Sequence, residues 1–419
     1  MYISTTSLLA LWATLSSAAS IPYINPSQLR RQAPSTKASD LYFPVENATL
    51  KNARVGEYYQ ASIGGLMIGP KNATAKFEKV GGEEWLDIST EGLISGTPAT
   101  GSEGSAELDL RATADDGSTT AALRITIPVR DAEEVLLDSL AVMSYNLWKG
   151  GANVNNHHEK QLRFILESGA DVIGLQESVD GGHAKRLGQA LGWNVWQTNS
   201  SAAILSRYSV EQEYGQVGVG GGLRINLNGN SAVRKQINFW NMHPTAYPYG
   251  PYGFCFNGTS AEQVLEIEAE SGRTSQMAEI LEAMTAQLAD SENIPVLLTG
   301  DMNAPSHLDW TSSRCGVAGF EWPTSILPAR AGLLDSYRVV NPDPSTMNGT
   351  TWSPIYPFNE GTTGAPEPQD RIDFIYATEQ LQALGSETML VGKPRPYSQH
   401  EDNEWTSDHR AVLTVFRLP

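Results

Sequence analysis

The chain has 419 residues, of which 40% are hydrophobic, with 10 Trp and 15 Tyr, and this supplies enough apolar material for two globular domains. Its formal net charge is -18 at pH 7. Attraction to the phosphate backbone of nucleic acids depends on clustered Lys and Arg, and the sequence contains no such run. The composition therefore argues against a processive nucleic-acid-binding protein. It is compatible with a bound divalent cation that reverses the field inside one cleft.

The N-terminus has the pattern of a secretory leader. Residues 7–20 form a short apolar run that ends in small residues and is too short to span a bilayer. This pattern is typical of a signal peptide over residues 1–20, although residues 1–6 carry no Lys or Arg. A dibasic pair, Arg30 and Arg31, makes residues 21–40 a candidate pro-segment and linker. No later stretch is long and apolar enough for a transmembrane helix, so we expect a secreted, extracellular protein.

Two further features fit a secreted glycoprotein. Asn-x-Ser/Thr sequons, the acceptors for N-glycosylation, begin at Asn47, Asn72, Asn199, Asn257 and Asn348. The two cysteines, Cys255 and Cys315, are expected to pair as a disulfide in a secreted chain, and the alternative is two buried thiols. Their spacing matches no structural zinc site.

Residues 41–130 have the pattern of short β-strands. Apolar and polar side chains alternate over residues 106–114 and 122–129, with an Asp-Asp-Gly-Ser turn between them. The segment from Trp85 to Pro98, with its Gly-Leu-Ile-Ser-Gly-Thr-Pro ending, resembles the immunoglobulin-like domains of secreted and surface proteins. This region has no His and no cluster of candidate ligands. We therefore predict an accessory β-sandwich over residues 41–130, followed by a linker over residues 131–138.

From residue 139 the pattern changes to strands mixed with helices. Apolar side chains recur at helical spacing over residues 158–168 and 273–289. Apolar strand-like runs occupy residues 140–145, 171–175, 202–206, 236–242 and 296–299. Strands mixed with helices over about 280 residues indicate a layered α/β domain.

The stretch from Pro295 to Pro305 is the clearest candidate for a site. An apolar strand stops at Gly300 and is followed by Asp301 and Asn303, which at alternating extended positions point to the same side. Ligands of open α/β sheets bind at the carboxyl ends of strands, which favours a site. The alternative is an ordinary Asx turn after a strand.

Polar residues lie at the ends or starts of the other apolar runs. Each one taken singly fits a cap, a turn or a surface group. The pieces, in chain order, are Ser-Tyr-Asn146-Leu, Leu-Gln-Glu177, Asn-Met-His243, Gly-Asp301-Met-Asn303, Arg-Ile-Asp373-Phe-Ile-Tyr and Ser-Asp408-His409. Together, over roughly residues 139 to 418, they resemble the endonuclease/exonuclease/phosphatase superfamily, also called DNase I-like. The resemblance implies an α/β fold for residues 139–419, a four-layer α-β-β-α sandwich of two mixed sheets with helices outside.

The resemblance also implies a Mg²⁺-type ion, with Mn²⁺ or Ca²⁺ as substitutes. Glu177 and the amide oxygen of Asn146 are hard oxygen ligands of the kind that Mg²⁺ prefers. Asp408 would contribute as a ligand or from a second shell. Several carboxylates in one cleft resist ionising together unless a cation lies among them.

The resemblance further implies hydrolysis of a phosphate ester by in-line attack of water, with roles for the remaining motif residues. Asp301 would orient or deprotonate the water, and Asn303 would hold a phosphoryl oxygen. His409 would contact the phosphate while Asp373 fixes its tautomer. His243 would stabilise the phosphoryl oxygens or assist the leaving group.

Four residues are candidates for substrate binding: Lys149, Tyr247, Tyr249 and Tyr252. Lys149 follows Asn146 closely enough to reach a phosphate, and the alternative is a solvated Lys. The tyrosines lie on a loop rich in Pro and Gly, residues 244–255, directly after His243, and the alternative is a packed surface loop. Thr351 and Trp352 resemble a pair that the family carries before its Arg-x-Asp strand, and we interpret them as structural or rim residues. His157 and His158 are interpreted as a solvated helix start.

We expect a hydrolase that acts on a phosphodiester or phosphomonoester of a small molecule or a lipid head group. The longer signature of the inositol polyphosphate 5-phosphatases is not reproduced after Asn303. An extracellular nuclease is the alternative enzyme, with nucleic acid as a partner that the net charge disfavours. A binding protein that kept the fold and lost catalysis is an alternative of another class.

Overall fold

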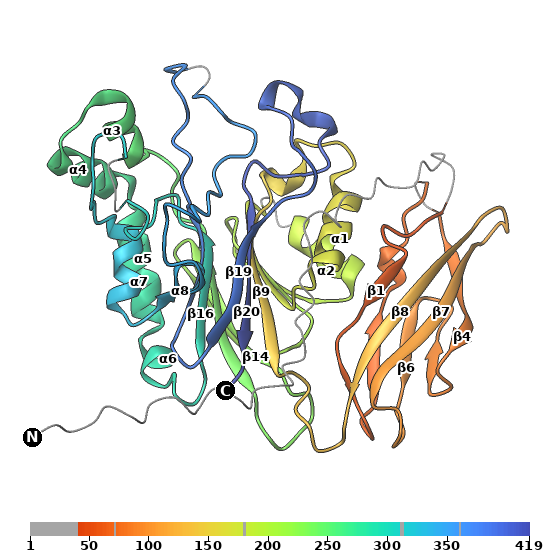
Figure 1. Ribbon diagram of the computed structural model, residues 1–419. Coiled ribbons are helices and arrows are strands. Elements are labelled where there is room, and N and C mark those ends of the chain that lie inside the picture. Colours follow the sequence, from red (N-terminus) through yellow and green to blue (C-terminus); the bar gives the residue numbers. More distant parts are fainter. Residues whose placement is uncertain (1–40, 71–72, 179–181, 311–313, 360–361) are drawn as a thin grey trace, which may run out of the picture.

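The computed structural model describes residues 41–70, 73–178, 182–310, 314–359 and 362–419. The proposed leader, the Arg30–Arg31 pair and the sequon at Asn72 lie outside the described residues. Two β-sheets of the N-terminal region lie beside a larger sandwich of two sheets flanked by helices (Figure 1). None of the helices in the described ranges is both long and apolar enough to cross a membrane.

Residues 41–130 fold entirely as β-structure. One sheet has the strand order β1-β8-β7-β4 with β2 beside β8, and the other has the order β3-β6-β5. The predicted hairpin is present as β7 and β8, which pair antiparallel with Leu108 opposite Ile125. The assignment of these sheets to the immunoglobulin-like class stays a prediction. The strands are β1 (Asn47–Thr49), β2 (Ala53–Arg54), β3 (Tyr59–Ser62), β4 (Ala75–Gly82), β5 (Leu86–Ile88), β6 (Leu93–Gly96), β7 (Gly104–Ala114) and β8 (Thr120–Arg130).

The first sheet of the larger sandwich has six strands and begins where the linker ends. Its order is β11-β12-β10-β9-β20-β19, with β9 and β10 parallel and the other neighbours antiparallel. The strands are β9 (Ser139–Asn146), β10 (Val172–Gln176), β11 (Asn194–Gln197), β12 (Ala203–Ser206), β19 (Gln382–Met389) and β20 (Ala411–Arg417).

The second sheet also has six strands and is mixed. Its order is β13-β14-β15-β16-β18-β17, with β15 and β16 parallel. Leu140 and Val142 of β9 pack against Phe239 and Leu297 of this sheet, and all four side chains are fully buried. The strands are β13 (Ser209–Val217), β14 (Gly220–Asn226), β15 (Gln236–Met242), β16 (Val296–Asp301), β17 (Leu334–Asp335) and β18 (Asp373–Ala377).

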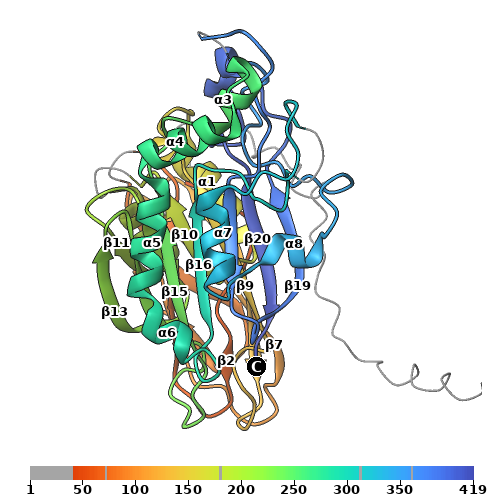
Figure 2. The ribbon, with the colours of Figure 1, turned by 90° about the vertical axis from the view of Figure 1, so that its left-hand side faces the viewer.

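Helices cover the outer faces of both sheets, which gives the predicted four layers. Helices α1 (His157–Ser168) and α2 (His183–Leu191) cover the first sheet (Figure 1), and α5 (Arg273–Ala283) and α7 (Pro323–Arg330) cover the second (Figure 2). The other helices are α3 (Gly250–Asn257), α4 (Ala261–Ser271), α6 (Thr285–Ala289) and α8 (Ser336–Val340).

The helical spacing over residues 273–289 is confirmed as α5 and α6, with Met284 between them. One prediction was wrong. The expected loop over residues 244–255 becomes helical at Gly250, where α3 begins. Phe254 of this helix packs against Trp310 and Trp322, so contacts distant in sequence override the local Pro and Gly content.

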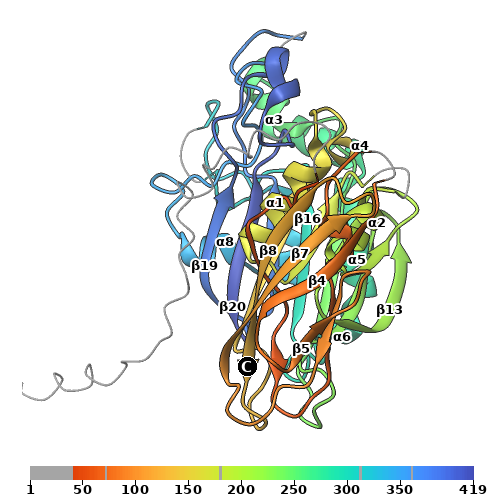
Figure 3. The ribbon, with the colours of Figure 1, turned by 90° about the vertical axis from the view of Figure 1, so that its right-hand side faces the viewer.

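The N-terminal sheets pack on the outer side of α1 and α2 (Figure 3). A short 3₁₀ turn, Gly64–Leu66, approaches α2 closely enough that a Cβ on Gly65 would lie 2.6 Å from the Cα of Ala190. Only glycine allows this approach. The apolar side chains of both regions form one continuous core.

Candidate active site

The strand register brings the predicted site residues to one end of the sandwich. Asn146 ends β9 opposite Gln176, so Glu177 follows directly at the same edge. His243 and Asp301 lie at the ends of the parallel strands β15 and β16, and Asp373 begins β18 opposite Asp301. Asp408 and His409 precede β20, which runs antiparallel to β9.

Asp301 is the centre of this cluster. Its side chain is 1% exposed, and its Oδ2 lies 3.6 Å from Nε2 of both His243 and His409. The same oxygen accepts a hydrogen bond of 2.9 Å from Nδ2 of Asn146, while Oδ1 accepts one from the backbone N–H of Asn303. A buried carboxylate held between two imidazoles and an amide has the fixed orientation that a general base needs.

His409 and Asp373 form the expected pair. Nδ1 of His409 lies 2.9 Å from Oδ2 of Asp373, and both residues are buried. Burial by itself lowers the pKa of His409, but the carboxylates of Asp373 and Asp301 outweigh it and hold that pKa well above its usual range. These two carboxylates therefore favour the protonated form of the ring. It can donate from Nε2 toward Asp301 while Asp373 orients it.

The ring of His243 is oriented by a hydrogen bond on the side away from Asp301. Its Nδ1 lies 2.8 Å from the hydroxyl of Ser201, and Nε2 faces Asp301. The hydroxyl fixes the orientation of the ring without adding a charge, in contrast to the Asp373 carboxylate behind His409. The two imidazoles that flank Asp301 are therefore electrostatically different.

Asp408 and Glu177 form the side of the cluster that fits a cation. Asp408 is buried and its Oδ1 has no hydrogen-bond partner. Burial is the main cause that raises the pKa of Asp408 to about 8, with His409 opposing this shift and the nearby Glu177 contributing to it. A buried carboxylate oxygen without a donor, beside a second carboxylate, is the environment that a hard divalent cation relieves.

A second group also has ligand geometry. Asp301, Asp373 and His409 offer atoms that all lie within 4.8 Å of one another. Within this group the His409–Asp373 hydrogen bond already satisfies one ring nitrogen and one carboxylate oxygen. Oδ1 of Asp373, like Oδ1 of Asp408, is buried without a hydrogen-bond partner, so each of the two groups offers an unsatisfied oxygen to an ion.

The two asparagines are oriented differently from the sequence-based expectation. The amide oxygen of Asn146 accepts from the backbone N–H of Trp148 at 2.9 Å, so its NH₂ group faces Glu177 and Asp301. The NH₂ group of Asn303 donates to the carbonyl of Pro244 at 3.0 Å. In this arrangement Asn146 is a donor that holds the carboxylates, and Asn303 ties β16 to the loop after His243.

Backbone strain is concentrated at the site. Trp148, Lys149, Glu177 and Asn303 have φ values of 53°, 54°, 55° and 49°, in the left-handed region that non-glycine residues rarely adopt. The carboxylate of Glu177 accepts from the backbone N–H of Lys149 at 2.7 Å, which locks the two strained segments together. The side chain of Lys149 is exposed at the rim.

The three tyrosines after His243 have different environments. Tyr249 is buried and its hydroxyl donates to Asp370 at 2.8 Å, so its role as a substrate contact stays a prediction that its burial disfavours. Tyr252 is half-buried and donates to Glu367 at 2.7 Å, while Tyr247 is 65% exposed. Tyr247 is the member of the trio most available to a ligand.

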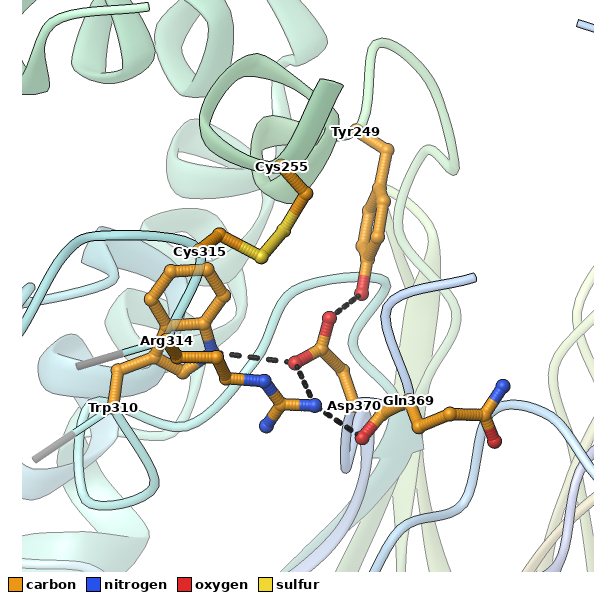
Figure 4. The surroundings of a disulfide bond; sticks show 7 residues. All are labelled: Tyr249, Cys255, Trp310, Arg314, Cys315, Gln369 and Asp370. Carbon is orange, nitrogen blue, oxygen red and sulfur yellow. Dashed lines mark hydrogen bonds and ion pairs between the residues drawn. A yellow bond between two sulfur atoms is a disulfide. The ribbon is translucent and has the colours of Figure 1, made fainter. Parts of the chain in front are cut away.

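The predicted disulfide between Cys255 and Cys315 is present, and the alternative of two free thiols is excluded. It ties α3 to the segment that carries Trp310 and Arg314, both of which contact Asp370 (Figure 4). Burial raises the pKa of Asp370, partly offset by Arg314. The disulfide and the contacts of Asp370 therefore fix the position of the loop that follows His243.

Three residues without a predicted catalytic role contact the site. Ser407 donates to the backbone oxygen of Asn146 at 2.6 Å and accepts from the N–H of His409 at 3.0 Å. The hydroxyl of Thr351 accepts from the N–H of Asp373 at 3.2 Å. The ring of Trp352 lies 5.0 Å from that of His409, closer to the chemistry than the expected rim role. In the sequence these residues are marked only by their positions next to the motifs, and position alone does not indicate a role.

Comparison with known proteins agrees with this geometry. The sequence profile of the Endonuclease/Exonuclease/phosphatase family matches residues 143–409. An uncharacterized protein of Caenorhabditis elegans is 32% identical over 298 residues, covering 67% of this chain and 91% of that protein.

Solved structures with a similar fold include truncated TDP2 of Caenorhabditis elegans, at 18% identity and a TM-score of 0.43, covering 67% of this chain and 98% of that one. The catalytic domain of Xenopus laevis APE2 has 14% identity and a TM-score of 0.41, covering 66% of this chain and 92% of that one. The profile match extends from β9 to His409 and so spans every motif residue gathered at the end of the sandwich. On this match, this chain is a member of the endonuclease/exonuclease/phosphatase family.

Proposed function

We propose that this protein is a secreted, metal-dependent phosphoesterase that hydrolyses a phosphodiester or phosphomonoester of a small molecule or lipid head group. The observation that carries the proposal is Asp301, buried with its Oδ2 3.6 Å from Nε2 of both His243 and His409. In-line attack of water on phosphorus needs a base that removes a proton from the water and, next to it, donors that stabilise the negative charge on the phosphoryl oxygens. A carboxylate between two imidazoles provides both.

Each side chain has a role that follows from its contacts. Asp301 orients the attacking water and takes its proton. His409, kept cationic by Asp373, donates from Nε2 to a phosphoryl oxygen as negative charge develops there. His243 donates to the phosphoryl oxygens or to the leaving oxygen. Asn146 keeps Asp301 and Glu177 in place through its NH₂ group.

Glu177 and Asp408 are the residues that would hold a Mg²⁺-type ion. When bound, such an ion polarises a phosphoryl oxygen and offsets negative charge on the phosphate. The side chain of Lys149 is exposed, and its backbone N–H donates to Glu177, so this side chain would contact a bound phosphate from the solvent side. The unpartnered oxygen of Asp408 supports the presence of a cation in the working enzyme.

Secretion is supported by two features of the chain. The Cys255–Cys315 disulfide is of the kind that persists in oxidising compartments. The four sequon asparagines within the described residues are exposed, namely Asn47, Asn199, Asn257 and Asn348. A glycosidase-sensitive mass shift of protein recovered from culture medium would support this part of the proposal, and retention inside the cell would contradict it.

The test is hydrolysis with and without metal. The purified protein is assayed with Mg²⁺ against bis(4-nitrophenyl) phosphate, sphingomyelin and plasmid DNA. We expect release of 4-nitrophenol that EDTA abolishes and Mg²⁺ restores. Glu177→Gln should raise the Mg²⁺ concentration needed for half-maximal activity, and the exposed Glu84→Gln should not.

The substrate panel also separates the competing functions. Plasmid nicking at low enzyme concentration, without turnover of the small esters, would favour a nuclease. No hydrolysis of any substrate would favour a binding protein on this fold. Full activity after exhaustive chelation would overturn the role of the metal.

A further inference from the structure

The loop between β11 and β12 carries a sequon at the catalytic end of the sandwich. This loop spans residues 198–202, and the sequon is Asn199-Ser-Ser201. Strand β12 begins at Ala203, which pairs with Leu175 near the end of β10. The loop therefore reaches the same edge of the sheet as the site residues that follow β9 and β10.

Two hydrogen bonds tie the loop to the site. The hydroxyl of Ser201 lies 2.8 Å from Nδ1 of His243. The backbone oxygen of Ser201 accepts from the N–H of Ser178 at 2.9 Å, and Ser178 follows Glu177 directly in the chain. The loop is therefore in contact with one catalytic side chain and lies next to a proposed metal ligand.

The hydroxyl of Ser201 belongs to both the active site and the sequon. In the folded protein it orients His243, and in the sequon it is the hydroxyl that the Asn-x-Ser/Thr motif requires for glycosylation of Asn199. Because only one residue separates the two, the Cα of Asn199 lies at most about 7 Å from the Cα of Ser201. A glycan on Asn199 would therefore begin close to a residue that contacts the catalytic His243.

The loop presents Asn199 to solvent on a fixed backbone. The N–H of Thr198 donates to the carbonyl of Ala202 at 2.9 Å, and the N–H of Asn199 donates to Oε1 of Gln216 at 2.8 Å. Asn199 is exposed, and within the described residues its side-chain amide makes no hydrogen bond. The side chain is therefore available for modification, and a glycan would be attached at a defined point.

A glycan at this position would act differently on small and large substrates. N-glycans are bulky and hydrated. A small ester needs room only for its own phosphate and one or two short groups beside His243. A polymer or a membrane surface extends past the phosphate and would have to displace the glycan. Such a steric obstacle reduces the binding of one class of substrate and leaves the contacts of the other class unchanged.

We propose that an N-glycan on Asn199 lies at the rim of the active site and restricts this enzyme to phosphate esters of small, free molecules. This inference rests on the proposed phosphoesterase function and on secretion, which brings the sequon to the glycosylation machinery. It deepens the proposed function by naming the size class of the substrate. Esters carried on a polymer or on a membrane surface are disfavoured as long as the glycan is present.

The experiment uses the secreted full-length protein. Peptide mass spectrometry measures the occupancy of Asn199. The values of kcat/KM with Mg²⁺ are then compared for a free 4-nitrophenyl phosphodiester and for the same diester coupled to dextran. Asn199→Gln should raise kcat/KM for the dextran-linked ester about tenfold and leave that for the free ester within about twofold of wild type.

Further variants separate the glycan from the hydroxyl of Ser201. Ser201→Thr keeps both the sequon and a hydroxyl, so it should keep the glycan and the wild-type ratio of the two kcat/KM values. Ser201→Ala removes both, so it should also lower kcat/KM for the free ester about tenfold, because His243 loses a hydrogen bond. Asn47→Gln is the matched control, because it removes an exposed sequon in β1 of the N-terminal sheets and should leave the ratio unchanged.

Each outcome decides the proposal. An unmodified Asn199 in the secreted protein would overturn it, and so would an equal rate on the dextran-linked ester with and without the glycan. If the free ester is hydrolysed in either case, the phosphoesterase function stands and the size restriction alone fails. If neither the glycosylated protein nor Asn199→Gln hydrolyses either ester, the proposed function fails and the size restriction fails with it.

Discussion

Asp301 shows at the scale of one residue how the fold prepares a catalytic group. Four polar neighbours surround its carboxylate, of which Asn146 and the backbone of Asn303 donate hydrogen bonds. His243 and His409 then face the same oxygen from two sides. A substitution that removes the charge of Asp301 and keeps the shape of its side chain should therefore reduce the catalytic rate without reducing the stability of the fold.

Asp301→Asn should reduce kcat/KM for a phosphate ester by about 10³-fold, because an amide cannot take a proton from water. The melting temperature should change by only a few degrees, since asparagine fills the same volume. The measurements are steady-state kinetics with Mg²⁺ and thermal unfolding. Asp138→Asn, at a side chain that is 67% exposed, is the control and should leave both unchanged. Near-normal turnover in Asp301→Asn would contradict its assignment as the base.

His158 illustrates a different residue-scale effect: it lies in the first turn of α1, as predicted, but it is not fully solvated. It is half-buried, and its ring nitrogen contacts the guanidinium of Arg186. Burial, then Arg186, lowers the pKa of His158 to about 4. Between pH 6.5 and 4 the unfolded chain thus binds a proton here that the folded protein does not, so stability falls on acidification.

His158→Gln should therefore flatten the loss of stability between pH 6.5 and pH 4, by about 1–2 kcal/mol after allowance for solvent screening. The measurement is the free energy of unfolding in urea at several pH values. Gln189→Ala, at an exposed and non-titrating position of α2, should keep the wild-type pH dependence. An equal slope in wild type and His158→Gln would show that another group causes the acid sensitivity.

At the scale of elements, α3 and its disulfide show why the loop after His243 has a defined shape. The helix is short, and the pairing of Cys255 with Cys315 closes a loop across 60 residues. The aromatic cluster of Phe254, Trp310 and Trp322 packs beside it. The rim of the site therefore depends on a covalent link as well as on packing.

The double variant Cys255→Ser/Cys315→Ser should lose about 4 kcal/mol of unfolding free energy in the chain-entropy model. Urea unfolding followed by tryptophan fluorescence measures this loss. Wild-type protein unfolded in dithiothreitol provides the control, since reduction should produce the same shift without a change in sequence. An unchanged urea midpoint in both would mean that packing alone supports the rim.

At the scale of the whole molecule, the buried side chain of Arg54 is one of the contacts that join the N-terminal sheets to the catalytic sandwich. Arg54 is 4% exposed and donates to the backbone oxygen of Asn228 at 2.7 Å and to that of Glu134 at 3.0 Å. In β2 it pairs with Arg130, just before the linker. This contact lies at the end of the sandwich where β9 begins, and the catalytic cluster lies at the end where β9 finishes.

Arg54→Met should lower the unfolding free energy by about 3 kcal/mol, because buried carbonyl groups lose their donors. Proteolysis within residues 131–138 should become faster, while kcat/KM for a small ester should stay within twofold of wild type. Arg111→Met is the control, because Arg111 is half-exposed in the same N-terminal sheet. A large loss of kcat/KM would indicate that the N-terminal sheets shape the site directly.

The sequence by itself determined the layered α/β fold and which residues stand at the strand ends. Apolar runs of strand length that stop at Asn146, Glu177 and Asp301 are local patterns, and local patterns specify where a buried strand ends. The polar residues then meet because strand register fixes their edge of the sheet. The disulfide was also predictable, since the chain has only two cysteines.

The tertiary structure decided the orientation of side chains and the partners that lie far apart in the chain. The amide of Asn146 turns its NH₂ toward the acids because the N–H of Trp148 occupies its oxygen. Tyr249 is buried because Asp370 lies beneath it, 121 residues away. The stacked rings of Tyr356 and Tyr397 likewise come from separate loops. No local pattern encodes such contacts, because they depend on which surfaces meet once the layers have packed.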